Sequence, residues 1–152
     1  MAKFLTLNTH SWMEEEQESK LNQLAERILQ EKYDVICLQE VNQLVESEQV
    51  VQAPFYYAVD GAIPIHQDHY ALLLVEKLAE AGMDYYWSWA YNHIGFDIYN
   101  EGVAILSRKP LKARELLVSD VNDPSDYHTR KVLLAETELD GQLITVASCH
   151  LS

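Results

Sequence analysis

The spacing of apolar residues along the first quarter of the chain predicts a strand, a helix and a second strand. Residues 19–33 place apolar side chains three and four positions apart, which is the stripe of an amphipathic helix. Residues 3–8 before it and 35–39 after it predict strands. The second of these is apolar until its end, as in a sheet covered on both faces. We therefore expect a helix lying over one face of an α/β sheet.

The rest of the chain predicts one more helix and a series of strands. Residues 68–81 have helical spacing and are followed by Gly82, which favours a left-handed cap. Asp140-Gly141 is a strong signal for a two-residue hairpin turn. Strands are predicted at residues 85–91, 103–106, 111–118, 129–139 and 142–150, and polar loops at 92–102 and 119–127.

Length and charge fit a single globular domain and disfavour one class of ligand. The 152 residues are 48% apolar, without repeats, low-complexity tracts or a linker, so we expect one domain over residues 1–152. Acids outnumber bases 24 to 11, giving a formal charge of −13. Phosphate contacts with long nucleic acids normally come from lysine and arginine. A nuclease remains compatible with this charge if its bases gather in the cleft or if metal ions supply the positive charge.

Targeting segments and cysteines point to a reducing compartment. The start, MAKFLTLNTH, is too short and polar for a signal peptide, and no apolar run could span a bilayer, so we expect no stable membrane insertion. Cys37 and Cys149 lie in strand-like runs and are predicted to be buried thiols. No cysteine or histidine spacing suggests zinc. The expected location is cytoplasmic.

Three predicted strands end in polar residues that could do chemistry. Asn8 follows LTL, Glu40 follows VICLQ, and His150 follows TVASC. Side chains at strand ends of open α/β sheets converge on one crevice. Each residue alone also fits an ordinary role: a turn asparagine, a helix-start carboxylate or a satisfied histidine. Together, an amide, a carboxylate and an imidazole match what metal-assisted hydrolysis requires.

Five segments in order resemble the endonuclease/exonuclease/phosphatase superfamily: LTLNTH, VICLQEVN, IYNEGVAILSRKPL, HTRKVLLAE and ITVASCHLS. Its members include metal-dependent DNases, apurinic-site endonucleases, sphingomyelinases and inositol-polyphosphate phosphatases. The resemblance implies an α/β fold, the N-terminal half of a DNase I-like four-layer α/β sandwich with mixed β-sheets flanked by helices. It also implies a metal-dependent phosphoesterase.

The resemblance assigns a metal site and a phosphate site. Glu40 matches the carboxylate that binds catalytic Mg²⁺, with Mn²⁺ as an alternative, and Asn8 matches the asparagine that supports the metal and the phosphate. His150 matches the histidine at the scissile phosphate, and Glu101 the acid that orients it. Two further matches line the phosphate pocket, Tyr99 and Arg130. From the residues alone, Tyr99 could equally be a packing residue and Arg130 a surface arginine.

The remaining motifs of the superfamily have no counterpart at the expected place. An Asp-x-Asn pair and a terminal Asp-His pair should follow the strand that ends in His150, and this sequence stops two residues after it. Three look-alikes come too early in the chain to replace them: 120–122, 126–128 and 68–69. We therefore expect an incomplete active site with little or no turnover, a missing C-terminal half and one exposed apolar sheet face.

Two functions remain open from the sequence. The first is a Mg²⁺-dependent phosphoesterase acting on a nucleic acid, lipid or small phosphoester, with the acidic charge favouring small or lipid-like substrates over long duplex DNA. The second is a non-catalytic, truncated or degenerate relative that binds a phosphorylated ligand or a protein. His10 is expected to be a solvated loop residue, and His66 and His69 to belong to a substrate-facing or capping segment.

Overall fold

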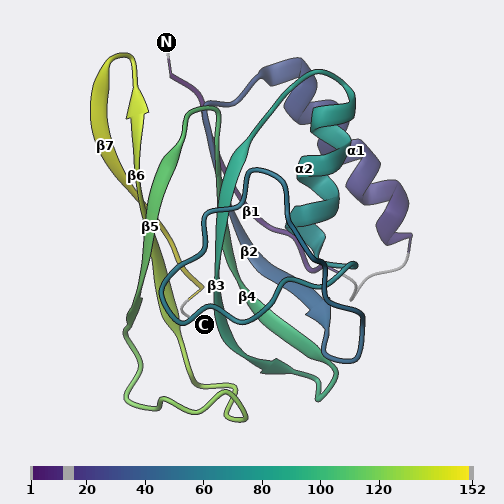
Figure 1. The fold of residues 1–152 in the computed structure, drawn as a ribbon, viewed down its shortest axis with the longest axis vertical. Helices are drawn as coiled ribbons and strands as arrows, with labels where there is room; N and C mark the ends of the chain where they lie inside the picture. The colour runs from purple at the N-terminus through teal and green to yellow at the C-terminus, as the bar shows by residue number, and fades with distance from the viewer. Residues whose placement is uncertain (1, 12–15, 151–152) are drawn as a thin grey trace.

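The structure, a computed structural model, describes residues 2–11 and 16–150. Two helices, a four-stranded sheet and a three-stranded sheet form three successive layers (Figure 1). None of the described helices is long and apolar enough to cross a membrane. The elements are β1 (Phe4–Asn8), α1 (Gln17–Glu31), β2 (Val35–Leu44), α2 (Tyr70–Glu80), β3 (Tyr86–Gly95), β4 (Tyr99–Ser107), β5 (Leu111–Leu117), β6 (Lys131–Leu139) and β7 (Gln142–Ser148).

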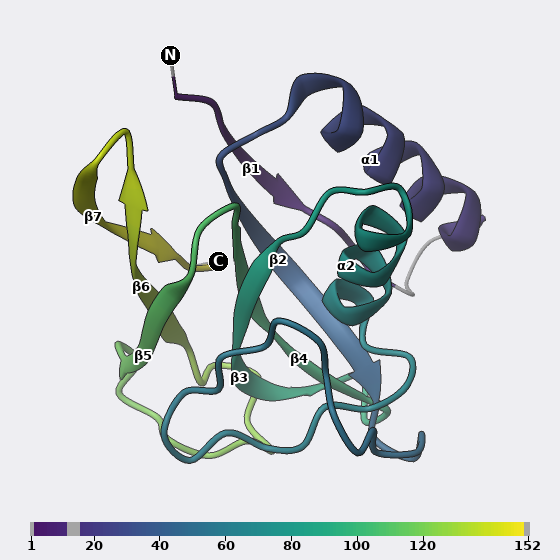
Figure 2. The same ribbon diagram turned by 45° about the horizontal axis from the view of Figure 1, so that its top comes forward.

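The larger sheet is mixed and carries the predicted strand–helix–strand unit. Its strand order is β1-β2-β4-β3, with β1 parallel to β2 and the other pairs antiparallel. Both helices lie against one face of this sheet, and the antiparallel sheet β5-β6-β7 lies against the other (Figures 1 and 2). The α/β class and the covering of β2 on both faces are therefore confirmed.

The apolar run of β2 divides between two cores because successive side chains of a strand point to opposite faces. Ile36 and Leu38 pack with the helices, whereas Val35 and Cys37 pack against the second sheet. The tight turn at Asp140-Gly141 is also as predicted, since both residues have positive φ angles, 50° and 79°.

The ends of two predicted strands were wrong, and both errors fall in the segments around Glu40 and Glu101. β2 continues beyond residue 39 to Leu44, and residues 92–102, predicted as a loop, form the end of β3, the turn and the start of β4. Both errors arise because the predicted strands end where apolar runs end, whereas the real strands continue through polar residues past a β-bulge. The register shifts lie between Leu38 and Val41 and between Tyr91 and His93.

The two cysteines are free, but they are only partly buried rather than fully buried as predicted. Cys37 donates a weak hydrogen bond from Sγ to the Ala147 carbonyl oxygen at 3.8 Å. Burial, with a smaller contribution from Cys149, raises the pKa of the Cys37 thiol to about 11. At neutral pH this side chain is therefore a thiol and a poor nucleophile.

His69 is the N-cap residue of α2, immediately before Tyr70. Its Nδ1 accepts hydrogen bonds from the backbone N–H groups of Ala71 at 3.2 Å and Leu72 at 3.4 Å. The ring is fully buried and lies against Trp87 and Trp89, with centroid separations of 5.2 and 4.6 Å. An accepting Nδ1 requires the neutral ring, so His69 is a structural cap and does not face a substrate.

This cap predicts acid lability. Burial, with a smaller effect of His66, lowers the pKa of His69 to about 3. Because the folded-state pKa lies below the unfolded value of about 6.5, the stabilisation is complete above pH 6.5 and is lost as the pH falls towards 3. We expect His69 alone to cost about 2 kcal/mol at pH 5 relative to pH 7.5.

Urea unfolding at the two pH values measures this loss. His69→Asn is the matched variant, because asparagine caps helices but does not titrate. The pH-dependent loss of unfolding free energy should be about 2 kcal/mol smaller in the variant. Equal losses in the two proteins would contradict the assignment.

Candidate active site

Glu40 lies at the bulge of β2 and not at the end of a strand. Leu38 pairs with Ala104 and Val41 with Gly102, so Gln39 and Glu40 together oppose one residue of β4. Glu40 has a positive φ of 51°, which is unfavourable for a side chain larger than glycine. Such bulges commonly redirect a side chain beside an active site. The direction of the Glu40 side chain is therefore set by the local backbone geometry of the bulge.

The segment after β1 clamps this bulge through the Glu40 carbonyl oxygen. That oxygen accepts hydrogen bonds from Thr9 Oγ1 at 2.9 Å and from Ser11 Oγ at 2.7 Å. Ser11 Oγ in turn accepts the backbone N–H of Asn42 at 2.8 Å. These bonds satisfy the backbone groups that the bulge removes from the sheet. The strained residue is thereby held in one conformation.

Two histidines approach the Glu40 carboxylate from opposite ends of the chain. His10 Nδ1 lies 2.7 Å from Glu40 Oε2, and His150 Nε2 lies 3.9 Å from Oε1. Oε2 is buried, yet within the described part of the chain it has no hydrogen-bond partner of acceptable geometry. A buried carboxylate is costly unless a cation or donor reaches it, and His10 approaches this oxygen closely without forming a hydrogen bond. This atom is the strongest indication of a cation-binding function.

His150 reaches Glu40 because the end of β7 is anchored on β2. Ser148 Oγ donates to the Leu38 carbonyl oxygen at 3.3 Å and accepts from Gln39 Nε2 at the same distance. The two sheets are thus joined immediately beside the bulge. The predicted meeting of Glu40 and His150 in one pocket is confirmed.

The opposite wall of the cleft is a chain of three polar side chains. Glu101 Oε2 contacts His93 Nε2 at 2.9 Å, and Arg130 Nη1 lies 3.1 Å from His93 Nδ1. Glu101 and His93 are 11% and 5% exposed, so this pair is largely shielded from water. His93 Nδ1 also lies 3.3 Å from the Thr129 carbonyl oxygen, so the ring contacts both Glu101 and the segment that carries Arg130. The carboxylate therefore fixes the histidine, and the histidine contacts the guanidinium.

This arrangement differs from the predicted role of Glu101. Glu101 was expected to orient His150, but the histidine that it contacts in the described structure is His93. The cause is the bulge of β3, which pairs His93 directly with Glu101 and turns both side chains to the same face. His93 was missed because it lay in a segment predicted to be a loop.

Two predicted site residues lie near the cleft without lining it. Asn8 Oδ1 accepts the backbone N–H of His10 at 3.1 Å, and His10 has a φ of 48°. Asn8 therefore shapes the turn that presents His10 to Glu40. Tyr99 opens β4 two residues before Glu101, where it pairs with Leu44 and Gly95. The metal and catalytic roles of Asn8 and Tyr99 stay predictions.

His10 is half exposed, as expected for a loop residue, but its contact with Glu40 places it in the site. The cleft that these side chains enclose has a volume of about 600 Å³. Four of the six predicted residues meet in it. Its lining consists of His10, Glu40, His93, Ile94, Gly95, Phe96, Glu101, Tyr127, Arg130 and His150.

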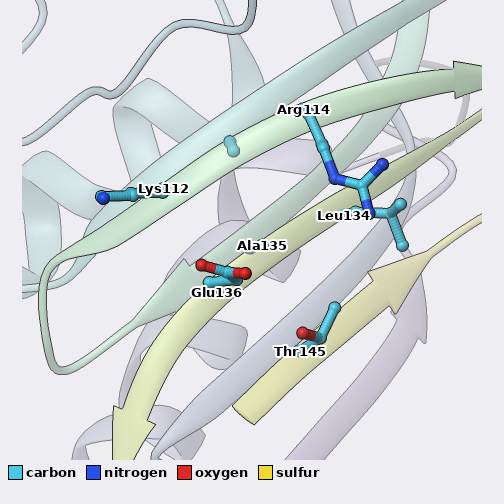
Figure 3. A pocket seen from close by; sticks show the side chains of 7 residues that line it. Lys112, Arg114, Leu134, Ala135, Glu136 and Thr145 are labelled. Atoms are coloured by element: carbon cyan, nitrogen blue, oxygen red, sulfur yellow. The ribbon is translucent and has the colours of Figure 1, made fainter. Parts of the chain in front are cut away.

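A smaller hollow of about 200 Å³ lies on the second sheet and contains none of the predicted site residues. Figure 3 shows Lys112, Arg114, Glu136 and Thr145 projecting from β5, β6 and β7 around it. These positions alternate with the residues that pack against the first sheet, so they belong to the outer face. The lining of the hollow also includes Ala113, Leu134 and Ala135, so charged and apolar side chains are mixed there.

The carboxylates of two early look-alike motifs bind backbone N–H groups outside the cleft. Asp68 Oδ2 accepts the backbone N–H of Leu44 at 2.8 Å, and Asp126 Oδ1 accepts that of His128 at 2.9 Å. The His128 N–H and ring lower the pKa of the Asp126 carboxyl. Neither Asp68 nor Asp126 lines the cleft.

Comparison with known proteins identifies the family. Residues 12–148 match the model of the Endonuclease/Exonuclease/phosphatase family. The chain belongs to this family. A comparison with curated proteins found no significant match. Membership places the chain among phosphoesterases, and the predicted resemblance is confirmed.

Solved structures of other proteins share the fold over all or nearly all of this chain. An endonuclease/exonuclease/phosphatase family protein from Leptotrichia buccalis C-1013-b is 34% identical, with a TM-score of 0.87 over 100% of this chain and 54% of its own. One from Beutenbergia cavernae DSM 12333 is 17% identical, with a TM-score of 0.60 over 98% of this chain and 37% of its own. D. rerio TDP2, complexed with single-strand DNA product, is 14% identical, with a TM-score of 0.51 over 97% of this chain and 44% of its own.

The chain thus spans about half the length of the first of these relatives and less of the others. It matches part of the DNase I-like fold, as predicted.

Proposed function

We propose that the cleft is the phosphate-binding half of a metal-dependent phosphoesterase site, in which water attacks phosphorus. The observation that carries this proposal is the buried Glu40 carboxylate, which His10 and His150 approach in a cleft shared with Arg130. A phosphoester brings negative oxygens, and the reaction increases the charge on them. A site for it therefore needs cations or donors around the phosphate and a carboxylate for the metal.

The chain's own cations are arranged to bind those oxygens. Arg130 is held by His93 and by its own loop, since Nη1 donates to the carbonyl oxygens of Thr129, at 3.1 Å, and of Tyr127. His150 and His10 flank Glu40 on the other side. Fixed donors of this kind stabilise developing charge without reorganising during the reaction. Arg130 is assigned to the phosphate oxygens, and His150 to the oxygen that gains charge.

The donors fit Mg²⁺ with Glu40 as its protein ligand. The described residues contain no group of three or more histidine, cysteine, aspartate or glutamate side chains placed to hold a metal ion. Mg²⁺ does not need such a cage, because it keeps several waters and accepts one or two carboxylates. When bound, the ion supplies charge neutralisation on the phosphate. Asn8 is proposed to support this site from the adjoining turn.

Metal removal tests the proposal in the complete gene product that contains this chain. Hydrolysis of bis-p-nitrophenyl phosphate is expected in millimolar Mg²⁺, to be abolished by EDTA and to return when Mg²⁺ is added in excess. His150→Ala should reduce the restored rate by about 100-fold, because it removes a transition-state donor. Activity that resists EDTA, or no hydrolysis of any phosphoester, would reject the enzyme and favour a phosphate-binding module.

A further inference from the structure

Two aromatic side chains stand exposed on the rim of the cleft. Phe96 is 77% exposed and Tyr127 is 64% exposed, and both line the cleft that contains Glu40 and Arg130. Phenylalanine side chains are usually buried, because exposing an aromatic ring to water is unfavourable. An apolar patch beside a polar cleft commonly contacts a ligand.

The backbone at Phe96 is strained in a way that keeps this ring outside. Phe96 and Asp97 have φ angles of 51° and 61°, and Ile98 N–H donates to the Gly95 carbonyl oxygen at 3.2 Å to close the turn. Hairpin turns with two positive φ angles favour asparagine and glycine. A bulky ring at the first of these positions gains nothing from burial here. Strain of this kind is retained mainly where the side chain has a function.

Tyr127 is held beside this turn by a second loop. The Ile94 N–H donates to the Pro124 carbonyl oxygen at 2.7 Å, which joins the β3–β4 hairpin to residues 119–130. The Tyr127 ring lies against His128, with centroids 4.0 Å apart and the ring planes tilted by 34°, and the Tyr127 carbonyl oxygen accepts a hydrogen bond from Arg130 Nη1. The guanidinium assigned to the phosphate is therefore bonded to the residue that carries the second ring.

We infer that Phe96 and Tyr127 form a stacking platform for a planar aromatic group attached to the phosphate. This inference rests on the proposed function and narrows its substrates to phosphoesters that carry a nucleobase or a phenolic ring. Rings of both kinds present a π-face that aromatic side chains bind without a specific hydrogen-bond pattern. The inference disfavours lipid-like phosphoesters as substrates, because their substituents have no aromatic π-face.

Binding of three phosphomonoesters to the complete gene product, measured by calorimetry in Mg²⁺, tests the platform. Methyl phosphate has no ring, phenyl phosphate carries a phenolic ring, and thymidine 5′-monophosphate carries a nucleobase. We expect at least one ring-bearing ligand to bind about tenfold more tightly than methyl phosphate, the scale of one stacking contact. The ring-bearing ligand that binds more tightly shows whether the platform prefers a phenolic ring or a nucleobase.

Variants separate stacking from general effects. Phe96→Leu combined with Tyr127→Leu should abolish the preference and leave methyl phosphate binding unchanged, whereas Phe4→Leu, at a 55% exposed phenylalanine on β1, should leave the preference intact. Phe96→Asn should lose part of the preference while raising the melting temperature, because asparagine tolerates the left-handed turn.

The possible failures are distinguishable. Equal binding of all three ligands, or a preference that survives the double substitution, would overturn the platform while leaving the phosphate site intact. If methyl phosphate does not bind at all, the proposed function fails as well.

Discussion

Glu40→Gln is expected to reduce Mg²⁺-dependent phosphoester hydrolysis by the complete gene product at least about 100-fold, or ~3 kcal/mol of transition-state stabilisation. The substitution is nearly isosteric, so the bulge and its clamp by Thr9 and Ser11 should persist. It removes the negative charge from the atom that lacks a hydrogen-bond partner in the described structure. The rate should therefore fall without loss of folding.

Initial rates over a range of Mg²⁺ concentrations measure this effect. Glu136→Gln is the matched control, because Glu136 is an exposed carboxylate on the outer face of the second sheet. The control should keep the activity and Mg²⁺ dependence of the unmodified protein. If Glu40→Gln retained a third or more of the rate at equal Mg²⁺, the assignment of the metal ligand would be wrong.

Gly102→Ala is expected to destabilise the fold by about 3 kcal/mol or more. A Cβ atom at this position would lie 2.1 Å from the Ala90 carbonyl oxygen and 2.7 Å from Trp89 Nε1. Trp89 crosses this glycine to donate to the Val41 carbonyl oxygen at 3.1 Å. The clash is with backbone and with a fully buried ring, neither of which can move without breaking the sheet.

The midpoint of urea unfolding tests this expectation, with Gly95→Ala as control. Gly95 lies in the same hairpin, but a Cβ there would be 3.5 Å from its nearest neighbour, an ordinary contact. The control should change the unfolding free energy by less than about 1 kcal/mol. Similar effects of the two substitutions would show that close packing at Gly102 is not what requires glycine.

These positions show why the segment EGVAILSR is informative in sequence. Gly102 lets the Trp89 side chain of β3 cross β4 and reach β2. Glu101, the residue before it, contacts His93, and the apolar residues after it fill both cores. The residues that meet these requirements all lie on β4, so they stay together in the chain even though their partners lie on other elements. A family resemblance can therefore be recognised from this segment.

The sequence by itself determined the α/β class, the strand–helix–strand unit, the family and the residues at the centre of the cleft. Periodicity within one element records which face is buried, and that information is local. Glu40 and His150 could be predicted because each directly follows an apolar strand core.

Only the tertiary structure decided the partners and the exact placement of these side chains. Two β-bulges extend β2 beyond Glu40 and pair His93 with Glu101, and bulges have no reliable pattern in a single strand. The approach of His10 to Glu40, the contact of His93 with Arg130 and the presence of Phe96 and Tyr127 in one cleft all join segments far apart in the chain. Such contacts depend on how the layers pack, because packing, unlike periodicity, is set by the whole fold at once.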